Sequence, residues 1–295
     1  MQLTVSNLTK TYSNGVQALK NVNLSIPQGM FGLLGPNGAG KSSLMRTIAT
    51  LQEADSGSVF LDDLDVLKEK AAVRKILGYL PQEFGVYPRI TAEQMLDHIA
   101  RLKGISNGKE RKDTVAALLS RVNLFAERKK NLGTFSGGMK QRFGIAQALL
   151  GSPKLIIVDE PTAGLDPAER NRFYNLLSEL GTNTIVILST HIVEDVKTLC
   201  SDFAIICNGE VLRHDNPDEA VNEMQGKIFV KSVDKTAIEE LRQQYEVVSV
   251  QMKGGQLSVR ICADTAPGNG FTPTPPTLED VYFHQISNRM DVVTL

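Results

Sequence analysis

The chain has 295 residues, 42% hydrophobic and 22% charged, which is typical of a folded protein with one large domain and a smaller one. A formal net charge of −1 argues against nucleic acid as a partner, because nucleic-acid binding depends on neutralising phosphates with Lys and Arg. No apolar run approaches the roughly 18 residues of a membrane span, and residues 1–5 do not have the pattern of a signal peptide. We therefore expect any role at a membrane to depend on a partner protein.

Strands are predicted over residues 2–11 and 22–34, like edge strands around a turn at 13–15. Further strands, with helical patterns between them, are predicted at 59–61, 76–80, 155–158, 184–188 and 203–206. One of these helices starts at Pro167 and stops at Gly181, and its inward residues are Phe173, Leu176, Leu177 and Leu180. The alternation predicts an α/β fold in which helices cover a parallel sheet.

From about residue 88 to 150 the pattern changes to helices alone, which predicts a helical insert within a domain spanning 1–222. Thr91 and Gln94 fit a helix capping box. Two apolar stripes follow at helical spacing, one of Met95, Ile99 and Leu102, the other of Val115, Leu118, Leu119 and Val122.

The remaining residues, 226–295, predict a small α+β accessory domain. Asn208-Gly209 just before it indicates a tight hairpin. Within it we expect strands at 227–231, 247–251 and 257–262, a helix near 234–245, a Pro-rich loop at 263–277 and a short helix at 278–283. Cys200, Cys207 and Cys262 form no Cys-x-x-Cys pair, so we expect idle thiols in a reducing cytosol, without disulfides or zinc.

Residues 35–42 match the G-x-x-x-x-G-K-[ST] pattern of a phosphate-binding loop, between a short strand at 30–34 and a helix. Glycines let backbone N–H groups surround phosphates, Lys41 would reach the β- and γ-phosphates, and the Ser42 hydroxyl would ligate Mg²⁺. The helix N-terminus would add positive potential. We expect a nucleoside triphosphate to bind at Gly35, Pro36, Asn37, Gly38, Ala39, Gly40, Lys41, Ser42 and Ser43.

Two further segments point to phosphate chemistry. A buried strand ends at Asp159 and Glu160, where Asp159 would hold Mg²⁺, directly or through water, and Glu160 would polarise the attacking water. Ser136, Gly137 and Gly138 predict a second anion-binding helix N-terminus, because Ser136 is a good N-cap and the glycines expose N–H groups.

Together these motifs, in this order, resemble the ATP-binding subunit of an ABC transporter over essentially all of residues 1–222. The resemblance implies an ABC ATPase fold and an enzyme that hydrolyses ATP with Mg²⁺. It also implies that Tyr12 stacks on adenine, that Gln82 lies beside the metal and the reacting water, and that His191 is a catalytic switch residue. Asp166, in the segment 164–166, would lie close to the nucleotide.

In the same comparison Ser136, Gly137 and Gly138 match the signature motif, which would contact the γ-phosphate. Phe135 and Met139 depart from the commonest signature, where Leu and Gln stand. The serine and both glycines are intact, so we expect activity to be retained.

Residues 277–283 resemble the C-terminal extension of bacterial ABC-2-type export ATPases. This implies export through a separately encoded membrane permease, a homodimer of the ATPase subunit, and a cytoplasmic location on the inner face of the membrane. One alternative is a soluble ABC ATPase acting on a ribosome or nucleic acid, but such proteins usually carry two cassettes or a long coiled-coil insertion, and neither is present. The other is an ATP-gated regulatory module, against which an intact Glu160 and His191 argue.

Residues 101–142 hold eleven Lys and Arg against three acidic residues, a net charge of +8. A solvated helix face is one interpretation. The other is a surface that meets anionic lipid or the permease.

Overall fold

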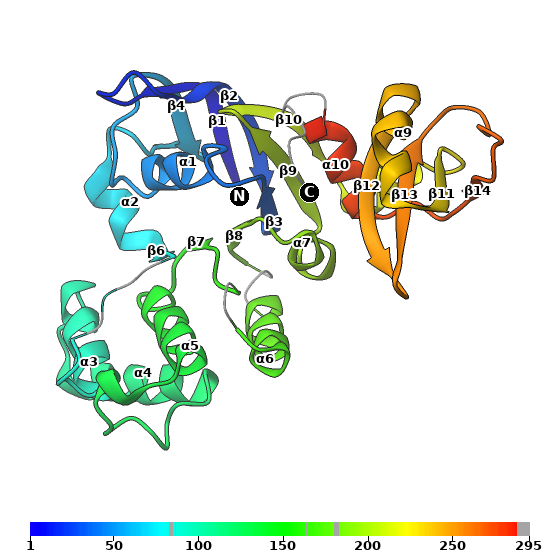
Figure 1. Cartoon of the computed structure of the whole chain (residues 1–295). Coiled ribbons are helices and arrows are strands. Elements are labelled where there is room, and N and C mark those ends of the chain that lie inside the picture. The colour runs from blue at the N-terminus through cyan, green and yellow to red at the C-terminus, as the bar shows by residue number, and fades with distance from the viewer. Residues whose placement is uncertain (83–84, 86, 163–164, 180–182, 288–295) are drawn as a thin grey trace.

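The structure, a computed structural model, describes residues 1–82, 85, 87–162, 165–179 and 183–287. Its centre is a six-stranded sheet in the order β10-β9-β3-β8-β7-β6 (Figure 1). Its strands are β3 (Gly29–Leu34), β6 (Leu77–Leu80), β7 (Leu155–Asp159), β8 (Ile185–Thr190), β9 (Asp202–Cys207) and β10 (Glu210–Asp215). All pair in parallel except β10, which closes the edge through an antiparallel hairpin at Asn208-Gly209. The predicted parallel sheet and hairpin are confirmed.

A second, antiparallel sheet lies beside the first, in the order β2-β1-β4-β5. Its strands are β1 (Gln2–Thr11), β2 (Gln17–Pro27), β4 (Ser56–Leu61) and β5 (Leu64–Asp65). The single predicted strand 22–34 was wrong, because β2 ends at Pro27 and Gly29, at φ +124°, turns the chain into β3 of the other sheet. The strand at 59–61 likewise belongs to this antiparallel sheet, and β1 is an inner strand rather than an edge strand.

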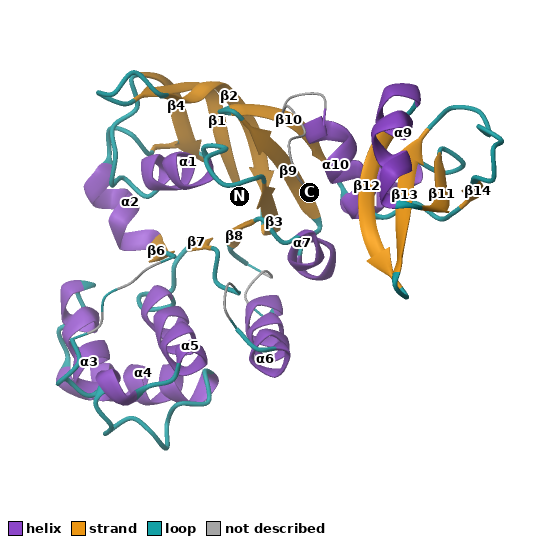
Figure 2. Ribbon diagram, viewed as in Figure 1, coloured by secondary structure: helices purple, strands orange, loops and turns teal. Residues whose placement is uncertain are grey.

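The central sheet is buried on both faces. On β8, Ile185 and Ile187 face one cluster with α1 (Lys41–Ile48), whereas Val186 and Leu188 face another with α5 (Gly137–Ala148) and α6 (Pro167–Ser178). This alternation follows the two-residue period of a strand. Helix α1 therefore lies between the two sheets, and the helical segment 92–148 together with α6 lies on the opposite face of the central sheet (Figure 2).

The predicted helical insert is confirmed as α3 (Ala92–Leu102), α4 (Gly108–Arg121), the 3₁₀ turn η1 (Leu132–Thr134) and α5 (Gly137–Ala148). The Thr91/Gln94 capping box is present. The first apolar stripe was placed one residue off, since Leu96 is fully buried and Leu102 is 74% exposed. Short alanines at 92 and 100 complete the buried stripe, and small side chains are a weak signal in a sequence. In the second stripe, Val115, Leu119 and Val122 are buried as predicted.

Outside the insert, the described helices beside the first two sheets also include α2 (Lys70–Ile76), α6 (Pro167–Ser178), α7 (Val193–Leu199) and α8 (Pro217–Asn222). Helix α6 starts at Pro167 as predicted, and Phe173, Leu176 and Leu177 are buried. Its predicted end at Gly181 and the inward Leu180 lie outside the described residues. Among the described helices, none is long and apolar enough to cross a membrane.

The C-terminal segment forms a third sheet, β12-β13-β11-β14. Its elements are β11 (Ile228–Val233), η2 (Lys235–Ala237), α9 (Ile238–Gln244), β12 (Glu246–Lys253), β13 (Gln256–Cys262), β14 (Thr272–Pro273) and α10 (Leu278–Ser287). A small apolar core of its own contains Phe229, Val259 and Ile261. Helix α10 contacts α7, α8 and β9 as well as β12, so it packs between this sheet and the central one.

The start of α10 is held by a buried ion pair. Arg260 donates from Nε and Nη2 to the two oxygens of Asp280, which is 1% exposed. The same carboxylate accepts from the backbone N–H and hydroxyl of Thr277. This arrangement gives the Thr-Leu-Glu-Asp stretch a structural role, because it satisfies a buried charge and begins the helix.

Candidate active site

The phosphate-binding loop joins β3 to α1, as predicted. Gly40 precedes the helix at φ +108°, and no side chain caps the first N–H groups of α1. A Cβ on Gly40 would lie 2.4 Å from the Ala18 carbonyl oxygen, and one on Gly35 would lie 2.2 Å from that of Ile206. Gly38, at φ +80°, has open space around it instead. The lack of a side chain at Gly35 and Gly40 therefore lets the loop pack closely against the neighbouring backbone. The uncapped N–H groups at the start of α1 can bind an anion.

Lys41 is bent back into the loop. Its ammonium donates to the carbonyl oxygens of Gly35 at 2.6 Å and Pro36 at 3.1 Å. It also lies 3.5 Å from Glu160 Oε1. Burial lowers the pKa of Lys41, and the charge of Glu160 opposes that shift. A phosphate group that binds here would contact an ammonium group that is already desolvated. Its present hydrogen-bond acceptors, the two carbonyl oxygens, are weaker than a charged phosphate.

The predicted catalytic residues Gln82 and His191 both contact the carboxylate of Glu160. Its carboxylate accepts from Gln82 Nε2 at 3.2 Å and lies 3.3 Å from His191 Nδ1, both at Oε2. Its backbone takes the left-handed φ of +46°, and its N–H donates to the Ser189 carbonyl. The structure thus brings Gln82, Lys41 and His191 to one carboxylate at the end of β7.

The neighbouring Asp159 fits a metal ligand. It is 3% exposed, and its Oδ1 is buried with no hydrogen-bond partner among the residues that the structure describes. Burial raises the pKa of Asp159, and the Ser189 and Ser42 hydroxyls act in the opposite direction. An orphaned carboxylate oxygen beside a serine hydroxyl matches the oxygen ligands that Mg²⁺ prefers, so the residues present fit this ion.

A cavity of about 690 Å³ opens above the loop. It is lined by Asn37, Gly38, Ala39, Gly40, Lys41, Ser42, Ser43, Gln82, Glu160 and Tyr12, and also by residues 16–18, Lys20, Asn208 and Gly209. The residues of this second group were not predicted to belong to the site, although Asn208-Gly209 was predicted to form a turn. The Gly209 N–H donates to the Ala39 carbonyl at 2.9 Å, so the β9–β10 hairpin braces the loop from a distant part of the chain.

Tyr12 lies on the wall of this cavity, half-buried. Its hydroxyl donates to Gln52 Oε1 at 2.8 Å and lies 2.9 Å from the Ser43 hydroxyl on α1. The ring is therefore held at the edge of the site, which is compatible with the predicted contact to a base.

The signature residues lie elsewhere and do not line this cavity. Ser136 caps α5 and accepts from the Met139 N–H at 3.2 Å, and both Ser136 and Gly137 are exposed. Gly138 is buried, and a Cβ there would lie 2.5 Å from Glu169 Oε2. Asp166 caps α6 by accepting from the Glu169 N–H at 2.8 Å, and Gly164 lies outside the described residues. The predicted site residues thus form two separate groups.

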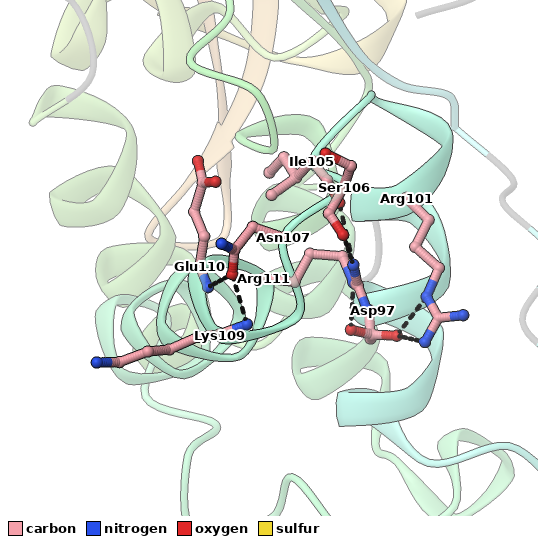
Figure 3. Close-up of polar contacts among 8 residues, drawn as sticks. All are labelled: Asp97, Arg101, Ile105, Ser106, Asn107, Lys109, Glu110 and Arg111. Carbon is pink, nitrogen blue, oxygen red and sulfur yellow. Dashed lines mark hydrogen bonds and ion pairs between the residues drawn. The ribbon is translucent and has the colours of Figure 1, made fainter.

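Many basic side chains of the segment 101–142 form hydrogen bonds or ion pairs within the protein. Arg111 is 9% exposed and donates to Asp97 and to the carbonyls of Ile105 and Ser106 (Figure 3). Its hydrogen bond holds the pKa of Asp97 below its usual range. Other members bind carbonyls or acids too, among them Lys103 and Arg142. A surface facing anionic lipid therefore stays a prediction for the exposed lysines, Lys109, Lys112 and Lys129.

Comparison with known proteins assigns the family. The family described as ABC transporter matches residues 19–163. The chain is 37% identical to an uncharacterized ABC transporter ATP-binding protein, YxlF, of Bacillus subtilis, over 78% of this chain and 76% of that one. It is 36% identical to the linearmycin resistance ATP-binding protein LnrL of the same organism, over 78% of this chain and 74% of that one. The chain therefore belongs to the ATP-binding proteins of ABC transporters, which are ATPases.

Solved structures of ATP-binding cassettes have a fold similar to that of this chain. The ATP-binding cassette MJ0796, in a dimeric post-hydrolysis state bound to ADP and Pi, matches with a TM-score of 0.67 and 29% identity over 72% of this chain and 98% of that one. An ATP-binding subunit of another ABC transporter matches with a TM-score of 0.68 and 28% identity, over 76% and 93%. These matches confirm the predicted ABC ATPase fold.

Proposed function

We propose that this chain hydrolyses ATP between two copies of itself and thereby powers export through a separately encoded membrane permease. The observation that carries the proposal is the separation of its two anion-binding groups. The loop cavity collects Lys41 and Glu160, whereas Ser136 and Gly137 present an exposed helix N-terminus on another part of the surface. A head-to-tail pair related by a two-fold axis would place each signature motif against the other copy's cavity.

Within each site the residues take distinct roles. Lys41 and the N–H groups of α1 bind the phosphates, and Tyr12 contacts adenine. Ser42, Asp159 and Gln82 would hold Mg²⁺, which neutralises charge on the phosphates when bound. Glu160 orients and deprotonates the attacking water, and His191 and Gln82 hold that carboxylate in place, as their contacts of 3.3 Å and 3.2 Å suggest. Asp166 begins α6 beside the facing copy.

Export and a permease partner are proposed from the relatives. LnrL is named for linearmycin resistance, and YbhF of Escherichia coli, 33% identical, is named a probable multidrug transporter ATP-binding protein. We place the cassette at 1–222, with its helical part at about 88–150, and the accessory domain at 226–295. The permease would hold the cassette at the cytoplasmic face of the membrane.

Replacing Ser136 by Arg tests the composite site. Ser136 lies outside its own copy's cavity, so the variant should bind ATP with near wild-type affinity but lose hydrolysis, which needs the facing signature. Ser120→Arg, on an exposed position of α4, is the control and should keep both properties. Hydrolysis per subunit should also rise with protein concentration in the wild type. Normal turnover by Ser136→Arg would contradict a shared site.

A further inference from the structure

Asp195 on α7 is a buried acid that the proposed mechanism does not use. It is 0% exposed, and its carboxylate accepts three hydroxyl groups. Thr162 and Thr190 donate to Oδ2 at 2.6 Å and 2.8 Å, and Tyr174 donates to Oδ1. Burying a carboxylate is costly unless it is hydrogen-bonded, so these hydroxyls and the carboxylate depend on one another.

Two of the three donors flank the catalytic groups in the sequence, and the third comes from a helix. Thr162 lies two residues beyond Glu160, Thr190 directly precedes His191, and Tyr174 lies on α6. Thr190 Oγ1 also accepts from the Ile192 N–H at 2.9 Å. The residues on both sides of His191 are therefore tied, through one hydroxyl, to Asp195.

This anchor matters most for His191, whose side chain has less packing around it than that of Glu160. The His191 side chain is 44% exposed, so packing around the imidazole does little to fix its position. Glu160 has a left-handed backbone, a conformation that persists only where the surrounding structure over-determines it. The Asp195 network supplies buried contacts to both segments.

We infer that Asp195 is a positioning residue that keeps His191 in register with Glu160. This inference rests on the proposed function and adds a residue that contacts neither ATP nor water. The Thr190 hydroxyl transmits the effect, since it joins the carboxylate to the backbone beyond His191.

Substitutions at Thr190 test the inference because they distinguish the effect of the side chain's shape from the effect of the hydrogen bonds that its hydroxyl makes. Thr190→Val keeps the shape and removes the hydroxyl, whereas Thr190→Ser keeps the hydroxyl. We expect Thr190→Val to lower kcat by about 10- to 100-fold, the effect of a small misplacement of catalytic groups. KM for ATP should change by less than about twofold, because the phosphate loop is untouched. Thr190→Ser should recover most of the rate.

Tyr174→Phe is the matched control. It removes a hydrogen bond to the same carboxylate without touching the His191 turn, so it should lower the melting temperature but leave kcat within about twofold of wild type. If Tyr174→Phe and Thr190→Val lowered kcat equally at equal loss of stability, Asp195 would have a structural role only, and the inference would be overturned.

A double mutant separates this result from the fate of the proposed function. In a His191→Ala background, Thr190→Val should reduce kcat by less than about a further twofold, because both changes act through one residue. Independent, multiplying effects would refute the positioning role. Normal turnover by His191→Ala and Glu160→Gln would instead refute the proposed catalytic residues themselves.

Discussion

The Lys41 ammonium lies 3.5 Å from Glu160 Oε1, and the two side chains are only 5% and 10% exposed. Lys41, which we propose binds the phosphates, is thus paired with Glu160, which we propose activates water. The ammonium group offsets the charge of the carboxylate. If phosphate binds at Lys41 as we propose, it would compete with Glu160 for the ammonium group and free the carboxylate to contact water.

This pairing predicts a non-additive effect on stability. Lys41→Met should destabilise the nucleotide-free protein by about 3–5 kcal/mol, because it leaves a nearly buried carboxylate without its cation. Adding Glu160→Gln to the same chain should recover much of that loss. Urea unfolding of both single variants and the double variant measures the coupling, and simple addition of the two losses would argue against a paired role.

Asp159→Asn should stabilise the nucleotide-free protein at neutral pH. Burial raises the pKa of Asp159 in the folded state, so its favourable contribution is present below the unfolded pKa of about 3.9 and is lost as pH rises through the folded pKa. The amide side chain in the Asp159→Asn variant does not ionise, so the variant does not lose this stability as the pH rises. A gain of about 1 kcal/mol would raise the melting temperature by ~2–4 °C, and the gain should shrink as the pH approaches 4.

The same variant should lose the extra stabilisation that Mg²⁺ adds to ATP binding. Melting curves with ATP, with and without the metal, provide this comparison. An Asn variant that was less stable at pH 7 and kept its metal response would contradict the assignment of Asp159 as a metal ligand.

Two adjacent glycines of the signature motif should respond in opposite ways. Gly138→Ala places a methyl group 2.5 Å from Glu169 Oε2, so the Glu169 side chain must move and weaken its ion pairs with Arg142 and Arg172, which should cost about 1 kcal/mol or less in the isolated chain. Gly137→Ala meets nothing within 4 Å and should be neutral or slightly stabilising, since Ala favours helix. Thermal unfolding compares them, and equal costs would show that the Glu169 contact is not what requires a glycine.

The Arg260–Asp280 pair should control the attachment of α10. Arg260→Ala leaves the buried Asp280 without its cation and should destabilise the C-terminal segment by about 3–5 kcal/mol. Glu279→Ala, at the exposed neighbouring position, is the control and should change stability by less than about 0.5 kcal/mol. Hydrogen exchange in α10 reports the effect locally, and equal protection in both variants would refute it.

Features encoded by local pattern were predictable. The apolar runs at β7 and β8 are buried on both faces, and the phosphate loop, the Ser136 cap and the Asn208-Gly209 turn each depend on nearby residues. The strand at 59–61 was assigned to the wrong sheet because its alternation does not show which strand it pairs with. The stripe of α3 was misplaced because alanines carry little signal.

Contacts between distant segments could not be read from the sequence. Nothing local indicates that Gly209 braces Ala39, that Lys20 lines the cavity, or that Asp195 collects hydroxyls from three segments. Each depends on how the strands are ordered in the sheet. The roles of Gln82 and His191 came from family resemblance, because a lone Gln or His has no chemical signature.

The central claim, a site shared between two copies, is tested most directly by measuring the mass of Glu160→Gln in solution. This variant should bind ATP but hydrolyse it about 10²–10⁴-fold more slowly, so the nucleotide stays trapped between the copies. Light scattering with saturating ATP and Mg²⁺ should then show a dimer, and with ADP a monomer. A Glu160→Gln protein that stayed monomeric while saturated with ATP would contradict the account.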